Sequence, residues 1–290
     1  MKIVISIFCL PYEIDELENT LNQLKKASYY IDKSLDWNLD VTMCTSSEMV
    51  NWDKSSINKK YFEDKFLKLA SNTDWCVKNF QTSEKILGCV SQRRFSFEKH
   101  RDADYFIWLD TDIIFDERTL TYIDNIANQL KHPSPIITPE IVKVWDNSWD
   151  CLVNEKFLNE PTDYQKNNNP FVDCGIKGDI SVETVVCNWP NHPTMKFAGG
   201  WFTCIHKSIL DKITVPESFG HYGMEDTFLM WACEKLKFGQ QYKIKNLVIC
   251  ENYKFRFNQH ITNRLASISR KDEFLKIAQS NFPIELEKLV

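Results

Sequence analysis

Glycine is scarce in this sequence, with only 8 among 290 residues, and we find no low-complexity tract and no internal repeat. No run of about 18 apolar residues is present, which predicts that no segment spans a membrane. None of the ten cysteines forms a Cys-x-x-Cys pair, which disfavours a zinc site, and a chain this long disfavours a disulfide framework. Scattered thiols in apolar runs favour a reduced, cytoplasmic protein.

The overall charge is also modest, at a formal net value of -5. Nothing in that balance requires a nucleic-acid or anionic membrane partner. Hydrophobic residues make up 43% and charged residues 26%, as in globular domains. We predict one domain over residues 1–290, with a loop insertion at about 143–193 and a basic, closing segment at about 252–290. Residues 1–11 lack a cleavage site, so we expect a first strand there rather than a signal peptide.

The most informative stretch is the apolar run Tyr105–Leu109, which is rich in aromatic and β-branched residues. Such a run predicts a strand that is buried on both faces, as inside a parallel sheet. Asp110 and Asp112 follow where the strand should end, and a second apolar run begins at Ile113. Open α/β sheets bind their ligands at the carboxyl ends of their strands, so these carboxylates are candidate ligand-binding groups.

The spacing of the two aspartates predicts a cation site. If the chain is still extended there, Asp110 and Asp112 point to the same side, about 6.6 Å apart along the chain. Like charges so close together favour a divalent cation between them, with positions left for water or substrate phosphates. The alternative interpretation is an ordinary polar turn at the end of a strand.

Two further groups of residues carry candidate chemistry. Residues 197–202 form an apolar run with a glycine pair, Gly199 and Gly200, which marks a close approach of a ligand or another backbone. Glu225 and Asp226 fall at the start of a predicted helix. They fit either an acidic first turn favoured by the helix dipole or a general base that takes a proton from an attacking hydroxyl.

Apolar runs alternate with helical patterns along most of the chain. This alternation predicts an α/β fold with a mixed, mostly parallel sheet flanked by helices. Near the end of the last predicted strand lies His260, which is either solvated or structural, or a third ligand for a manganese-like ion.

In chain order, the Asp-x-Asp pair, the glycine pair, the Gly-x-Glu-Asp sequence at 223–226 and the late histidine resemble the GT-A fold glycosyltransferases. The resemblance is to inverting enzymes such as the β-galactosyltransferases and chondroitin-type polymerases, over residues 1–14 and 84–262 with a gap at the insertion. It implies a Rossmann-like GT-A fold and a hexosyl- or pentosyltransferase. Such an enzyme would move a sugar from a nucleotide-sugar donor, expected to be a UDP-sugar, to a hydroxyl of a saccharide or glycoconjugate, with inversion.

The same resemblance implies roles for individual residues. Asp226 would be the catalytic base, and Glu225 would hold the acceptor hydroxyl. A Mn²⁺ or Mg²⁺ ion would be bound by Asp112 and His260, with Asp110 contacting it through water or contacting the ribose. The remaining residues expected to bind the donor are Pro11, Tyr12, Arg93, Gly199 and Gly200, with Tyr12 a stacking candidate for the base and Arg93 a candidate for the diphosphate.

The acceptor stays open between two classes. Residues 254–276 hold six basic residues against two acidic ones, which fits a solvated surface or a groove for a polyanion. The chain also resembles, more weakly, viral glycosyltransferases that modify hydroxylated pyrimidines in DNA, and this predicts the cytoplasm of a bacterium or of a virus-infected host cell. A nucleotidyltransferase and a non-catalytic sugar-binding module are further alternatives.

Overall fold

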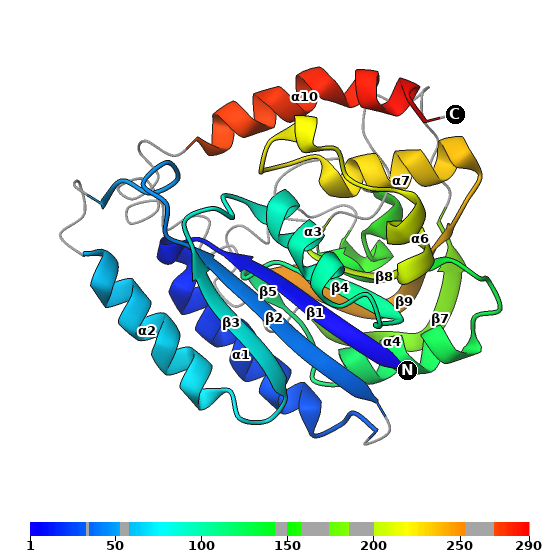
Figure 1. Ribbon diagram of the computed structural model, residues 1–290. Helices are drawn as coiled ribbons and strands as arrows, with labels where there is room; N and C mark the ends of the chain where they lie inside the picture. The colour runs from blue at the N-terminus through cyan, green and yellow to red at the C-terminus, as the bar shows by residue number, and fades with distance from the viewer. Residues whose placement is uncertain are drawn as a thin grey trace.

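A computed structural model of the chain describes residues 1–32, 35–52, 58–142, 150–157, 174–185, 200–252 and 270–289. They form one nine-stranded sheet with helices on both faces (Figure 1). The strands are β1 (Lys2–Cys9), β2 (Asp36–Cys44), β3 (Val77–Ser83), β4 (Tyr105–Leu109), β5 (Ile113–Ile114), β6 (Pro135–Val142), β7 (Gly175–Thr184), β8 (Phe202–His206) and β9 (Gln240–Glu251). The longer helices are α1 (Ile14–Ser28), α2 (Lys59–Asn72), α3 (Cys89–Lys99), α4 (Thr119–Gln129), α7 (Glu225–Leu236) and α10 (Lys271–Glu287), and α6 (Lys207–Lys212) is short.

The first half of the sheet is parallel. Its strand order is β3-β2-β1-β4, with β1 hydrogen-bonded to both β2 and β4. The chain therefore moves outward from β1 to β3 and then crosses back to the other side of β1. Because crossovers are right-handed, α1 and α2 cover one face of the sheet and α3 covers the other (Figure 1). The strand order reverses between β1 and β4.

The second half of the sheet is mixed. β8 runs antiparallel to β4 and β6, and β6 is parallel to β9. As a result β1, β2, β3, β4, β6 and β9 share one direction, while β5, β7 and β8 oppose it. The predicted α/β fold, a mixed and mostly parallel sheet flanked by helices, is confirmed.

Burial explains why the strongest sequence patterns were informative. All five residues of β4 are buried, as expected for a central strand with layers on both sides. In α1, Leu17, Leu21 and Leu24 share one face and are 0–5% exposed. α1 therefore buries an apolar stripe in the core and presents its polar face to solvent.

Several predicted boundaries are wrong. The sequence predicts a polar helix and loop over residues 55–80 and a helix from Thr82 to about His100. Instead, β3 occupies Val77–Ser83, and the helix begins only at Cys89. The reason is that β3 is an edge strand, half-exposed and polar, with no apolar run to identify it. β7 lies inside the segment 143–193 that we expected to be loops, much of which lies outside the described residues.

The C-terminal helix packs across the second half of the molecule. Phe274, Ala278 and Phe282 of α10 are buried, and the Phe282 ring lies 6.2 Å from Phe219 and 6.1 Å from Phe228, centre to centre. α10 thereby covers α7 and the turn before it (Figure 1). The sequence predicts a closing helix over residues 271–290 that is interrupted at Pro283, but α10 continues through this proline. Among the helices that the structure describes, none has the length and apolar character needed to cross a membrane.

Candidate active site

The carboxyl ends of β1 and β4 lie side by side where the strand order reverses. In doubly wound sheets this is the position at which the helices diverge to opposite faces and leave a crevice for a ligand. Asp110 follows β4, and its backbone amide donates to the carbonyl oxygen of Trp201 at 2.9 Å. Pro11 and Tyr12 follow β1. The sequence-predicted residues after both strands therefore meet at one edge, which we call the carboxyl edge.

Arg93, on α3, connects three segments at this edge. Its side chain is only 6% exposed, and its guanidinium donates to the carboxylate of Glu225. The same group donates to Oδ1 of Asp110 at 3.2 Å and to the carbonyl oxygen of Gly200 at 3.1 Å. It also lies 4.7 Å from the ring centre of Trp108. Because a buried guanidinium needs such partners, Arg93 fixes the start of α7 relative to the end of β4.

Asp226 ties the segment at residue 200 to the first turn of α7. Its Oδ2 accepts from the backbone amide of Gly200 at 2.7 Å, and its Oδ1 accepts from the amide of Thr227 at 2.6 Å. The loop before α7 reaches this position through left-handed backbone at Gly223 and Met224, with φ of 86° and 63°. A methionine in that conformation is uncommon, and it turns the two acids at the helix start toward the carboxyl edge.

The start of α3 and the loop before α7 touch through their backbones. A Cβ atom at Gly88 would lie 1.7 Å from the carbonyl oxygen of His221, so only glycine fits there. The amide of Val90 donates to that same carbonyl oxygen at 3.2 Å, and Ser91 Oγ is hydrogen-bonded to His221 Nδ1. Burial raises the pKa of the Cys89 thiol, and the charges of Asp110 and Asp226 add to this. The charges of Asp110 and Asp226 both act on the Cys89 thiol, so the two carboxylates lie in the same part of the molecule.

Asp112 has different neighbours. Residues 111 and 112 form a turn, so the extended chain on which we based a shared cation space is not present. Asp112 is 7% exposed, and its carbonyl oxygen accepts from the amide of Asn252 at 2.6 Å. Asn252 also donates to Glu16 on α1 at 2.7 Å. Burial raises the pKa of Glu16, the Asn252 hydrogen bond opposes that shift, and the charge of Asp112 adds to it.

Tyr12 is 8% exposed, so little of its ring faces solvent. Burial raises its pKa, with smaller contributions from Glu13 and from Tyr222 in the loop before α7. The exit of β1 therefore lies near that loop as well. Gly199 and His260 lie outside the described residues, and their predicted roles stay predictions.

Sequence reasoning did not identify Glu16, Asn252 or the contact of Gly88 with His221. Glu16 looks like any acid in the first turn of a helix, and Asn252 follows the last strand with no pattern around it. The scarcity of glycine was the available signal for Gly88, because in a chain with 8 glycines each one has a higher chance of a steric reason.

The described residues fit one kind of metal site. Across the described ranges, no group of three or more His, Cys, Asp or Glu side chains is close enough to hold a metal ion. Asp110 and Asp112 still supply two carboxylates within one turn at the end of β4. Mg²⁺ and Mn²⁺ use one or two carboxylates together with substrate phosphates. The residues therefore fit a cation shared with a diphosphate and not one held by the described side chains alone.

Comparison with known proteins gives matches of structure only. No protein-family model matches the chain, and no curated protein sequence matches it. Among solved structures, S. aureus TarS matches at 14% identity and a TM-score of 0.48, over 84% of this chain and 37% of TarS. TarS 1–349 in complex with UDP-GlcNAc matches at 12% identity and 0.49, over 98% of this chain and 73% of that one. A mycobacterial protein matches at 14% identity and 0.46, over 86% and 67%.

Proposed function

We propose that the chain is a GT-A type glycosyltransferase that moves a sugar from a nucleotide-sugar donor to an acceptor hydroxyl. One observation carries the proposal: Asp110, Gly200 and Asp226 gather around Arg93 at the edge where the strand order reverses. Sheets of this kind bind nucleotides at that position. UDP-GlcNAc in the TarS complex belongs to the donor class that the sequence resemblance implies, but matches this distant assign no activity, so the proposal rests on the side chains described above.

Among the residues that the structure describes at the carboxyl edge, Asp110, Asp112, Glu225 and Asp226 accompany the guanidinium of Arg93, so acidic side chains outnumber basic ones there. A diphosphate would be repelled there unless a cation came with it. We therefore propose that Asp112, with Asp110, holds Mn²⁺ or Mg²⁺ when the donor binds, and that the donor is a UDP-sugar. When bound, the cation would neutralise charge on the diphosphate leaving group.

Asp226 is the proposed catalytic base. Each of its oxygens accepts one backbone hydrogen bond, and an ionised carboxylate has about four lone-pair sites, so it retains the capacity to accept a proton. An acceptor hydroxyl would lose its proton to Asp226 while its oxygen attacks the anomeric carbon. The bond from that carbon to the diphosphate breaks, and the nucleotide diphosphate leaves with the electron pair. A single displacement of this kind inverts the anomeric centre.

We assign Glu225 and Arg93 to positioning rather than to direct contact with acceptor or diphosphate. Both side chains are nearly buried, and each is the other's ion-pair partner. Their pairing keeps the first turn of α7 in place, and Asp226 with it. Gly200 is buried, and a Cβ atom there would lie 2.7 Å from the Arg93 guanidinium, so this glycine makes room for Arg93. A contact of Gly199 and Gly200 with the donor sugar is proposed only because the sequence resemblance implies it.

The acceptor is proposed to be a saccharide or glycoconjugate. The DNA alternative rests on residues 254–276, most of which lie outside the described residues. Within the described part, Arg270 donates to Glu48 and Glu273 and lies over the ring of Phe274, so its charge is already paired. That pairing favours the saccharide.

A panel of nucleotide sugars, each incubated with and without a chelator, tests the proposal. We expect release of a nucleotide diphosphate from at least one UDP-sugar with manganese present, and its loss with the chelator. No release from any donor with metal present would contradict it. Binding of a donor without release would instead support the non-catalytic sugar-binding module, and release of pyrophosphate from a nucleoside triphosphate would support the nucleotidyltransferase.

A further inference from the structure

A second polar feature lies between α1 and α2. A cavity of about 430 Å³ opens there, and a neighbouring cavity of about 390 Å³ shares Glu18, Leu69 and Asn72 with it. Because the two cavities share these walls between α1 and α2, we treat them together as one groove along α2. We call it the α1–α2 groove and define it by Glu18, Leu21, Asn22, Tyr61, Asn72 and Trp75.

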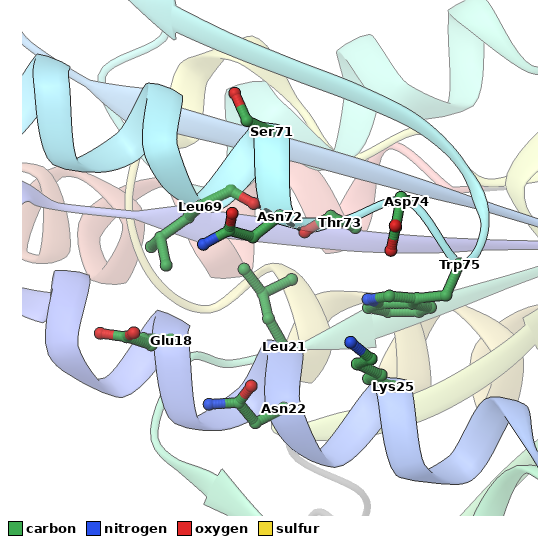
Figure 2. Close-up of a pocket in the computed structure, with 10 residues that line it drawn as sticks. All are labelled: Glu18, Leu21, Asn22, Lys25, Leu69, Ser71, Asn72, Thr73, Asp74 and Trp75. Carbon is green, nitrogen blue, oxygen red and sulfur yellow. Dashed lines mark hydrogen bonds between the residues drawn. The ribbon is translucent and has the colours of Figure 1, made fainter.

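The groove has an apolar floor and an aromatic residue toward each end. Leu21 and Leu69 are 5% and 6% exposed and form the floor. Figure 2 shows Leu21 and Lys25 pointing from α1 toward the segment Asn72–Trp75. At one end, the half-buried Trp75 ring packs against Trp37, with ring centres 5.3 Å apart. At the other end lies Tyr61, which is 52% exposed. Flat, amphipathic rings of this kind suit the apolar face of a sugar ring.

The charges in the groove are balanced, unlike those at the carboxyl edge. Three acids and three lysines line the two cavities: Glu18, Asp64, Asp74, Lys25, Lys65 and Lys68. Lys65 pairs with Asp15 and lies 4.0 Å from Glu18, so part of this charge is already compensated. A polyanion or a polycation would meet as many like charges as opposite ones. The amides of Asn22 and Asn72 offer both donors and acceptors, which suits a neutral, hydroxyl-rich ligand.

One end of the α1–α2 groove lies on the side of the sheet where the carboxyl edge is. Tyr61 lies near the start of α2, which follows the loop after the carboxyl end of β2, and Trp75 lies just before the start of β3. Figure 1 shows α2 running from the carboxyl edge toward the opposite edge of the sheet, and the residues that line the groove follow the same course. With 14 residues, α2 is about 21 Å long, a length that accommodates several sugar rings.

We propose that the α1–α2 groove binds an uncharged oligosaccharide. This inference rests on the proposed glycosyltransferase function. The oligosaccharide would be the acceptor, held along α2 while its end reaches the carboxyl edge. The groove would then select for chain length and for neutral sugars without touching the reacting atoms.

Titration of the protein with cellohexaose, maltohexaose and chitohexaose tests the proposed binding. The readout is the NMR signal of the Trp75 indole N–H, which is assigned by its loss in Trp75→Phe. Asn22→Trp fills the groove, and Asn19→Trp adds the same bulk on α1 outside both cavities. We expect at least one probe to bind with a Kd on the order of 1 mM or tighter. Asn22→Trp should weaken that binding at least tenfold, and Asn19→Trp should leave it within twofold.

The inference is overturned if no probe moves the Trp75 signal, or if the two tryptophan variants bind equally well. Should Asn22→Trp fail to fold, Asn72→Ala removes an amide without adding bulk and is expected to weaken binding at least threefold. UDP-GlcNAc binding, measured separately on the unmodified chain, distinguishes the two proposals. Oligosaccharide binding without any nucleotide-sugar binding would support the groove proposal and contradict the proposed function. Donor turnover without oligosaccharide binding would support the proposed function and contradict the groove proposal.

Discussion

Acidic and basic side chains line both the carboxyl edge and the α1–α2 groove, but the two regions hold them differently. At the carboxyl edge, Arg93 and Glu225 are 6% and 4% exposed and are bonded to each other. Asp64, which lines the groove, pairs with the neighbouring Lys60 on α2, and these side chains are 59% and 77% exposed. The first region is buried, interlocked and acidic, whereas the second is open to solvent and balanced in charge.

This difference teaches what each region is suited for. A buried network fixes charges in place before a ligand arrives, which is the arrangement that stabilises developing charge in a reaction. An open groove with exposed side chains can bind a neutral chain, but it holds no group rigidly enough for chemistry. Substitutions at the carboxyl edge should therefore abolish turnover or unfold the protein, and substitutions in the groove should change binding alone.

The largest effect is expected from Asp226→Asn. Removal of the base should lower the rate of transfer by about 10²–10⁴-fold, which is what a positioned general base contributes. Donor affinity, measured by calorimetry with manganese and UDP, should change less than threefold. Lost nucleotide affinity instead would remove Asp226 from the role of base and place it in donor binding.

Arg93→Met tests the interlocked character of the network. The variant leaves the buried Glu225 carboxylate without its guanidinium partner, and this should lower the free energy of unfolding by about 3–5 kcal/mol. Lys60→Met, in the exposed pair of α2, should leave the free energy of unfolding almost unchanged. Adding Glu225→Leu to Arg93→Met should restore part of the loss in a double-mutant cycle. Simple additivity of the two changes would contradict the coupling.

Gly88→Ala tests the backbone contact between α3 and the loop before α7. Its Cβ would overlap the His221 carbonyl oxygen, so the two segments must separate, at a cost of about 1–3 kcal/mol. Gly178→Ala is the control, because the nearest atom to its Cβ would belong to a side chain, that of Asn246 at 3.0 Å, and not to backbone. The measurement is the melting temperature of each variant, and Gly88→Ala should melt at the lower temperature. Equal melting temperatures would show that the contact between Gly88 and His221 does not contribute to stability.

The smallest effect is expected from Glu16→Gln. Because the pKa of Glu16 is raised in the folded chain, the folded state keeps this proton to higher pH than the unfolded state, and ionising Glu16 costs stability. The cost is absent below about pH 4, where the unfolded carboxyl is also protonated, and grows as pH rises through the folded pKa. Glu16→Gln should therefore gain up to about 1 kcal/mol at pH 7 and nothing at pH 4. A gain of equal size at both pH values would exclude this cause, and Glu18→Gln serves as the exposed control on α1.

The central part of the fold could be predicted because burial leaves a clear pattern in the sequence. Tyr105–Leu109 is apolar throughout and forms a buried strand, and the leucines of α1 recur at helical spacing. β3 could not be predicted in the same way. An edge strand has one partner and one solvated side, so Val77–Ser83 carries polar residues that resemble a loop.

Some residues of the candidate site could be predicted from the sequence, and others could not. Asp110, Gly200 and Asp226 were predicted from motifs in chain order, and the structure brings them together. The neighbours of Arg93 and Glu225 could not be predicted, because a pairing across 132 positions leaves no local pattern. The turn at Asp112 agrees with the alternative interpretation and not with the extended chain, and the sequence could not decide because a two-residue spacing is compatible with both.

The most direct test of the central claim is a crystal structure of the chain with Mn²⁺ and UDP, read by the anomalous signal of manganese. The account predicts one manganese peak at the carboxyl edge, in contact with the diphosphate and with Asp112 or Asp110. A peak elsewhere, or nucleotide bound with no manganese beside these aspartates, would contradict it.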